Sequence, residues 1–292
     1  MLKAKLKYFR GYFFALPLLI ALTLAILFPA IYNLGIAFYN YNFHSQSWEF
    51  IGFKNFAKLL HDPFFWNSFR VTLLWVIGNV SLQLILGLAI ALSLNSIIHF
   101  RGPFTGILLI PWISSFVVVA ILFIWIYHPQ LGVLNDILLR FGIIVEPIAW
   151  LASPGLAQIS LILANTWKFF PLVMITIFAG LQDVSQELVE ATQVDGANWF
   201  GTFRMVIFPT ILPSLSTAVL LSTIWAYNSF TLPMVMTGGG PLRATEIFGL
   251  YIYKLAFDAF DFGAAAAASL ILFGQIMAII ILYLRVAEKG RK

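Results

Sequence analysis

The chain contains no cysteine and few charged residues. Only 10% of its 292 residues are Asp, Glu, Lys or Arg, against about 25% in an average soluble domain. The absence of cysteine excludes disulfides, thiolate catalysis and cysteine-ligated metals. The four histidines, His44, His61, His99 and His128, are scattered without metal-ligand spacing, so we expect no metal site.

The net charge of +5 does not indicate a nucleic-acid partner, because the basic residues are few and many lie at the two chain ends. Apolar residues, in contrast, make up 61% of the chain, and the mean hydropathy is +0.93. So many apolar side chains cannot all fit inside one soluble core. They must face lipid, and the composition therefore predicts a membrane protein.

Long apolar stretches predict six membrane-spanning helices. Each stretch has about 20 residues or more, which is enough to cross a hydrocarbon core of about 30 Å. Backbone groups in lipid must be paired within their own segment, so all six are expected to be helical. We predict an all-α polytopic fold with one transmembrane domain over residues 1–292 and spans at about residues 11–36, 70–97, 104–127, 155–181, 209–235 and 263–285.

The distribution of Lys and Arg predicts that both termini are cytoplasmic. With the N-terminus inside, ten basic residues lie on the cytoplasmic side and six on the other, and four of the ten precede the first span. That first stretch follows basic residues as a signal peptide would. It is too long and lacks an A-x-A site, so we interpret it as an uncleaved anchor.

Lys168 is the only ionisable side chain expected deep in the membrane, and no predicted span contains Asp, Glu or His. A proton-driven pump needs a titratable relay inside the membrane, so the energy source is expected to lie outside the spans. A lysine at a helix centre costs about 2.5–3.5 kcal/mol. We expect Lys168 to face a polar cavity, although snorkelling with a packing role is the alternative. Pro111, Pro171 and Pro213 can each bend the span that contains it.

The predicted cytoplasmic loop 182–208 is long for a connection between two helices. Its pattern predicts a short helix at 186–194 with Ser185 as N-cap, a corner at Gly196, a second short helix at 197–207, and a new span opening at Pro209. The first half carries only acidic charges. Acidic groups are unfavourable at an anionic membrane surface, so we favour a protein-docking element over an interfacial helix.

Residues of this loop carry a resemblance to a known family. They resemble the EAA signature of binding-protein-dependent ABC permeases, in which E-A-A is followed after two residues by D-G-A and later by I-x-L-P. Thr192 replaces the second Ala of the signature and Phe208 replaces the Leu. The matching residues are Glu190, Ala191, Asp195, Gly196, Ala197, Phe203, Ile207, Pro209 and Pro213.

Further motifs place the resemblance over nearly the whole chain. They are similar to those of sugar permeases of the maltose and glycerol-phosphate type, which pair with a second, different permease. The stretches are 52–56, 125–127, 131–135, 167–171, 179–182, 236–241, 253–257 and 263–266.

The resemblance implies roles for three groups of residues. The first group couples the chain to an ATPase, with Glu190 as an ion-pair contact and Gly196 as the turn, and comprises Glu190, Ala191, Asp195, Gly196, Ala197, Phe203, Ile207 and Pro209. The second group lines a sugar path, with helix packing as the alternative, and comprises Trp167, Lys168, Phe169, Leu172, Ser222, Trp225, Tyr227, Asn228 and Ser229. The third group is an external loop facing a substrate-binding protein and comprises Gly238, Gly239, Gly240 and Pro241.

Aromatic faces with hydroxyl and amide groups, as at the end of the fifth span, suit a carbohydrate. The Gly238–Pro241 loop is not a phosphate-binding P-loop, because no Lys-Ser/Thr follows it, and no Gly-Lys dipeptide occurs anywhere in the chain. We therefore expect no catalytic residues and no cofactor in this chain, with ATP and Mg on partner subunits.

The resemblance implies a permease subunit of an ATP-driven importer for a mono- or oligosaccharide, polyol or sugar phosphate in a prokaryotic inner membrane. The implied partners are a second permease, two copies of an ABC ATPase and an extracytoplasmic sugar-binding protein. The alternatives are an ion-coupled secondary transporter and an intramembrane lipid-linked sugar transferase. A secondary transporter would need carboxylates in the membrane, and the predicted spans contain none. A transferase would need a catalytic cluster, and the sequence offers none beyond Asp258 and Asp261.

Overall fold

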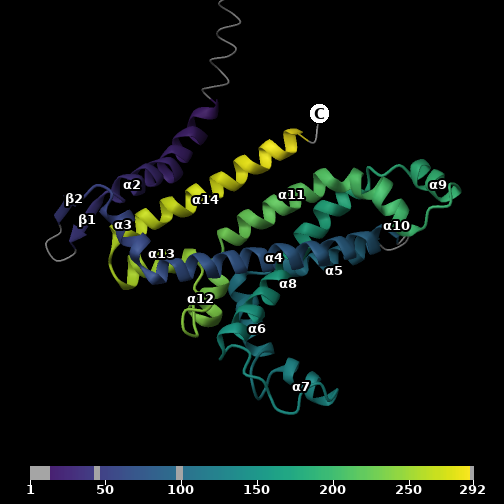
Figure 1. Cartoon of the computed structure of the whole chain (residues 1–292), viewed down its shortest axis with the longest axis horizontal. Coiled ribbons are helices and arrows are strands. Elements are labelled where there is room, and N and C mark those ends of the chain that lie inside the picture. The colour runs from purple at the N-terminus through teal and green to yellow at the C-terminus, as the bar shows by residue number, and fades with distance from the viewer. Residues whose placement is uncertain (1–13, 43–46, 97–100, 290–292) are drawn as a thin grey trace, which may run out of the picture. The chain divides into compact units, whose positions relative to one another are not determined.

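The computed structural model describes residues 14–42, 47–96 and 101–289, which are mostly helical (Figure 1). The chain divides into two compact units. One comprises residues 1–62 and 252–274, and the other residues 63–251 and 275–292. The prediction of an all-α membrane fold is confirmed, with one short hairpin that the sequence analysis did not predict.

Among the described residues, five continuous helices are long and apolar enough to cross a membrane. A sixth span results if a pair of helices that meet at 92°, Gly102–Ile113 and Phe116–Ile126, is counted as one broken span. A hydropathy profile does not reveal this bend, because the helices on both sides of it are apolar. The continuous helices are Phe14–Ile36, Pro63–Ser96, Pro154–Leu181, Trp199–Tyr227 and Phe262–Arg285.

The first unit is built around its apolar N-terminal helix and a β-hairpin. The helix ends in η1 (Thr23–Leu27) and α2 (Phe28–Ile36). The antiparallel strands β1 (Tyr39–Asn42) and β2 (Ser47–Phe50) and the short helix α3 (Lys54–His61) follow it. The unit also holds η3 (Lys254–Asp258) and the beginning of α14 (Phe262–Lys289).

Polar contacts fasten the parts of this first unit together. The Asn55 side chain donates hydrogen bonds of 2.9 Å to the carbonyl oxygens of Ala37 and Tyr39. Lys58 forms an ion pair with Asp261. A Cβ atom on Gly263 would collide with the carbonyl oxygen of Tyr39, so a glycine is required where α14 passes the first strand.

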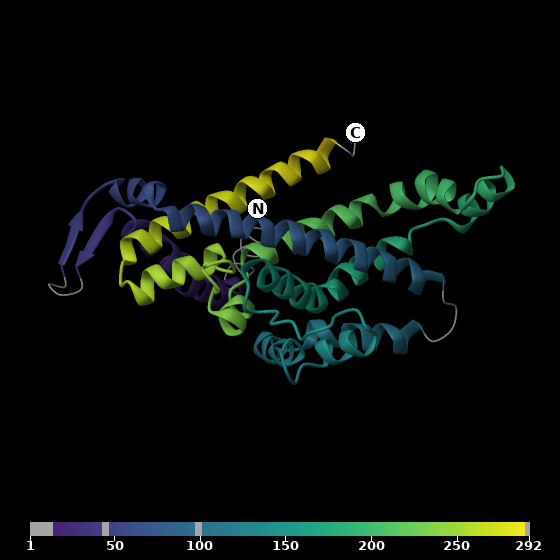
Figure 2. The same cartoon turned by 60° about the horizontal axis from the view of Figure 1, so that its bottom comes forward.

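The second unit has a core of three long helices, α4 (Pro63–Ser96), α8 (Pro154–Leu181) and α11 (Phe208–Tyr227), which lie side by side (Figures 1 and 2). Small residues let these helices approach closely. A Cβ atom on Gly87 would lie 2.7 Å from a methyl group of Val173. The core cluster consists of Ala91, Leu94, Val173, Met174, Ile177, Leu181, Ile211 and Ala218.

Shorter helices surround this core. The helices α5 (Arg101–Ile113) and α6 (Phe116–Ile126) form the broken third span, and α12 (Thr231–Thr237) packs against α6. The remaining helices of the unit are α7 (Val133–Arg140), α9 (Gln186–Val194), α10 (Trp199–Thr202), η2 (Phe203–Ile207) and α13 (Phe248–Tyr253), the last of which crosses the boundary between the units. Figure 1 shows α9 and α10 at one end of the unit and α12 at the other.

The fifth span differs from its prediction at both ends. It begins at Trp199, ten residues before Pro209, and it ends at Tyr227 instead of about residue 235. A π-helical turn, η2, directly precedes α11, and through it the helix continues past Pro209 although proline has no N–H to donate. The predicted helix at 197–207 is therefore present from Trp199 onward, but its predicted separation from the fifth span is wrong, because these residues form the start of that span.

Candidate functional site

The segment 186–207, which we call the elbow, has the corner that its sequence predicts. The helix at 186–194 is confirmed as α9, and Ser185 is its N-cap, accepting a hydrogen bond from the Leu188 N–H. Gly196 adopts φ +83°, a conformation that glycine accepts without strain. Asn198 then caps the next helix by accepting a 2.8 Å hydrogen bond from the Gly201 N–H.

One side-chain hydrogen bond connects the two arms of the elbow. The hydroxyl of Thr192 on α9 lies 3.1 Å from the hydroxyl of Thr202 on α10. Thr202 is buried, so its hydroxyl needs a partner inside the protein. This contact gives a physical reason for threonine at the position where the family signature has alanine, and the sequence analysis did not foresee it.

The surface of the elbow combines exposed apolar and acidic side chains. Glu190 and Asp195 are exposed, together with Ala191, Gly196 and Pro209, whereas Ala197, Phe203 and Ile207 are half-buried. Phe203 stacks on Trp199 with ring centroids 5.5 Å apart. Large exposed apolar side chains surrounded by polar residues are typical of a protein-binding surface. They are Leu188, Val194, Trp199 and Phe200.

Replacing Gly196 with valine is expected to disrupt the elbow without unfolding the spans. A β-branched residue at φ +83° is strained by about 1–2 kcal/mol or more. The matched control is Gly142→Val, since Gly142 has φ +65° and equally open surroundings but lies outside the elbow. We expect ATP-dependent uptake to fall with Gly196→Val alone. Equal losses in both variants would contradict a specific role for the corner.

Among the predicted path residues, the structure brings Lys168, Phe169 and Trp225 together. The Phe169 ring lies 5.7 Å from that of Phe116 and 5.5 Å from that of Trp225, so the three rings form a row. Ser222 is buried one helical turn before Trp225. Trp225 is at one end of this row and is 45% exposed, so its ring is accessible to a ligand. Phe169, Ser222 and Trp225 keep their predicted role as candidates for contact with a sugar.

The remaining path residues are spread around this row. Trp167 is half-buried, edge-on to the ring of Phe123, and Leu172 is also half-buried. Tyr227 and Ser229 are buried, while the exposed Asn228 donates a hydrogen bond to the carbonyl oxygen of Ile224 in its own helix.

Lys168 has partners that the sequence analysis did not identify. Its side chain is only 2% exposed, and its ammonium donates to the carbonyl oxygens of Ser114 and Trp112, at 2.5 and 3.2 Å. It also lies 4.4 Å from the centre of the Phe116 ring. The ammonium group is therefore surrounded by main-chain carbonyls at the break in the third span, and not by the polar cavity that the sequence analysis expected.

The Gly238–Pro241 loop is a hydrogen-bonded turn. Gly238 and Gly239 have positive φ, and Gly238 ends α12 in the left-handed conformation. The Thr245 hydroxyl donates a 2.8 Å hydrogen bond to the carbonyl oxygen of Gly240 and lies 2.6 Å from the hydroxyl of Thr237. The next residue, Leu242, is 90% exposed with φ +50°, a strained apolar tip that the sequence analysis missed.

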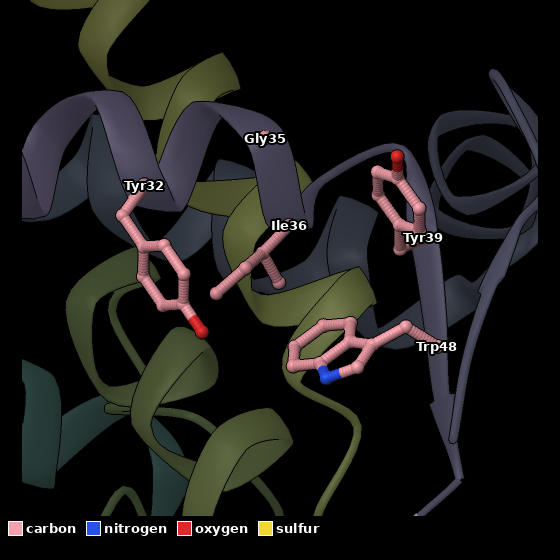
Figure 3. Close-up of a pocket in the computed structure, with 5 residues that line it drawn as sticks. All are labelled: Tyr32, Gly35, Ile36, Tyr39 and Trp48. Atoms are coloured by element: carbon pink, nitrogen blue, oxygen red, sulfur yellow. The ribbon is translucent and has the colours of Figure 1, made fainter.

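Another feature that the sequence analysis missed is a pocket of about 280 Å³ in the first unit (Figure 3). It lies between the end of α2 and the β-hairpin, and its walls are Tyr32, Gly35, Ile36, Tyr39 and Trp48. Tyr and Trp at the end of a span are typical of the membrane–water interface. The pocket belongs to the first unit, whereas every predicted path residue belongs to the second.

A family model described as "binding-protein-dependent transport system inner membrane component" matches residues 83–290. The chain belongs to this family of transporter permeases, and the predicted recognition is confirmed. It is 34% identical to the trehalose/maltose transport system permease protein MalF of Thermococcus litoralis, an alignment that covers 99% of this chain and 98% of the relative. It is also 34% identical to the sulfoquinovosyl glycerol transport system permease protein SmoG of Agrobacterium fabrum, over 92% of this chain and 87% of the relative.

The fold is shared with solved transporter structures. A bacterial alginate ABC transporter in complex with an alginate pentasaccharide-bound periplasmic protein includes a chain that matches with a TM-score of 0.84 at 21% identity. The match covers 99% of this chain and 97% of the other. At this identity the likeness establishes the fold, which is that of an ABC importer permease.

Proposed function

We propose that this chain is a permease subunit of an ATP-driven importer for a carbohydrate and forms half of the translocation path. The observation that carries the proposal is the combination of family membership with an exposed, acidic and apolar elbow at one end of the helical core. The sugar class is supported by the names of the relatives, which transport trehalose, maltose or sulfoquinovosyl glycerol.

In this proposal, the elbow docks on a cytoplasmic ATPase. Leu188, Trp199 and Phe200 supply exposed apolar area, and Glu190 supplies a charge for a basic partner group. ATP and Mg bind to two copies of that ATPase. ATP-driven closure of the ATPases displaces the two elbows of the permease pair, and the spans then change from inward-facing to outward-facing.

The proposed orientation places both termini and the elbow in the cytoplasm. The excess of Lys and Arg on that side supports it. Because α12 and the loop that follows lie at the opposite end of the second unit from α9, the Gly238–Pro241 loop then faces the extracytoplasmic side (Figure 1). There it meets the sugar-binding protein, and a second, different permease completes the path.

Reconstitution into liposomes tests this function. The chain is purified with a candidate partner permease, ATPase and binding protein, and uptake of radiolabelled maltose, trehalose and sulfoquinovosyl glycerol is measured with and without internal ATP. We expect uptake of a sugar that requires ATP and all four components. Uptake by this chain alone, driven by an ion gradient, would instead establish a secondary transporter.

A further inference from the structure

The break in the third span leaves carbonyl groups without helical partners. The last carbonyls of an α-helix have no intrahelical donor and must be satisfied by other groups. At the end of α5, the Ile110 carbonyl accepts from the N–H and the hydroxyl of Ser114. Beyond it, the carbonyls of Trp112 and Ser114 point to a donor from another helix, which is Lys168 of α8.

A cation is the appropriate donor at this position. The C-terminal end of a helix carries a partial negative charge, and a lysine there is stabilised both by the dipole and by charge-assisted hydrogen bonds. The ring of Phe116, in the first turn of α6, lies 4.4 Å from the same ammonium group. Lys168 thus contacts the end of α5 and the start of α6 at once.

We propose that Lys168 is a positioning residue that fixes the 92° bend between α5 and α6, and that it does not bind the transported sugar. The inference rests on the proposed function for its importance in transport, but the geometry of the bend is independent of that function. The bend points α6 away from α5, and α12 packs against α6. The bend also holds Phe116 against Phe169 and hence the row of rings that ends at Trp225.

The contacts of Lys168 argue against a direct role with the sugar. Its side chain is 2% exposed, and two of its three possible hydrogen bonds are made to carbonyl oxygens. Among the described residues, no salt bridge involves this lysine. The carbonyls and the Phe116 ring therefore compensate its charge, and an apolar side chain of similar length, such as methionine, would leave the carbonyls without a donor.

The test measures the bend directly with spin labels. The chain has no native cysteine, so Ile107→Cys on α5 and Ile121→Cys on α6, both exposed, can be labelled in the otherwise unchanged protein. Distances are recorded by double electron–electron resonance in lipid nanodiscs, without sugar or ATP. We expect Lys168→Met to shift or broaden this distance distribution, and Lys168→Arg, which keeps the donors, to preserve it.

A second label pair controls for unfolding. Ile77→Cys on α4 and Ile159→Cys on α8 are exposed positions on continuous helices and should keep their distance in Lys168→Met. If Lys168→Met changes the distances of both label pairs, both measurements are repeated in Lys168→Gln. Glutamine retains a donor for the carbonyls, so we expect this variant to keep the α5–α6 distance of the native chain. An unchanged α5–α6 distance in Lys168→Met, with the fold intact, would overturn the proposal.

The uptake assay separates positioning from sugar binding. We expect Lys168→Met in the complete transporter to lower the maximal rate by about tenfold or more, because two charged hydrogen bonds are lost, while KM for the sugar stays within about twofold. A tenfold higher KM at an unchanged bend would identify Lys168 as a sugar contact. If neither the native chain nor any variant transports sugar, the result counts against the proposed function. The α5–α6 distances would still test the role of Lys168 in the bend.

Discussion

Replacing Glu190 with lysine is expected to abolish ATP-dependent sugar uptake while leaving the isolated chain folded. Glu190 is exposed on α9, outside the helical core formed by α4, α8 and α11. Reversing the charge of one member of an interfacial ion pair costs about 2–5 kcal/mol or more, which weakens docking by about 30-fold or more. The measurements are ATPase binding by co-purification and uptake by the reconstituted transporter.

The matched control for this variant is Asp183→Lys. It makes the same change in charge, and Asp183 is exposed just before the elbow in the connection that follows α8. We expect it to retain most of the uptake. If Glu190→Lys kept native docking and uptake, the ion-pair role that the family signature implies would be wrong for this chain, although the apolar part of the elbow could still dock.

Replacing Gly87 with leucine is expected to destabilise the helical core strongly. The new Cβ atom would lie 2.7 Å from a Val173 methyl group and 3.0 Å from the backbone nitrogen of Met174, and a backbone atom cannot rotate away. Overpacking of a core costs about 1–3 kcal/mol, and here α4 and α8 must also separate. Thermal stability in detergent, followed by size-exclusion chromatography after heating, measures the effect.

Gly106→Leu is the control for this second variant. Gly106 lies inside α5, and a Cβ atom there meets nothing within 4 Å. Its replacement removes a helix-interior glycine, which favours the helix by about 0.5–1 kcal/mol. We expect stability to be kept or raised. Equal destabilisation by both leucines would show that the close approach of α4 and α8 does not limit the size of residue 87.

The spans could be predicted from the sequence because lipid requires a run of apolar residues in every one of them. Their ends could not be placed as well. Pro209 looks like the first residue of a span, but the preceding π-helical turn lets the helix run on from Trp199. Pro111 marks a weak point in the third span, yet the break comes after Ile113, where Lys168 supplies the hydrogen bonds.

The elbow was predictable because its signals are local. Ser185, Gly196 and the acidic pattern lie within a few residues of one another, and each acts on its own segment of backbone. The partners of Lys168 lie 54 and 56 residues earlier in the chain and are carbonyl groups, which every residue has. No residue type marks them, so only the packing of α8 against α5 identifies them.

The continuity of the helix from Trp199 to Tyr227 has a mechanical consequence. At 1.5 Å per residue it is a rod of about 40 Å with no loop inside it. The Thr192–Thr202 hydrogen bond ties α9 to the base of this rod. In the proposed coupling, a displacement of α9 is therefore passed along this continuous helix to the end at which Trp225 lies.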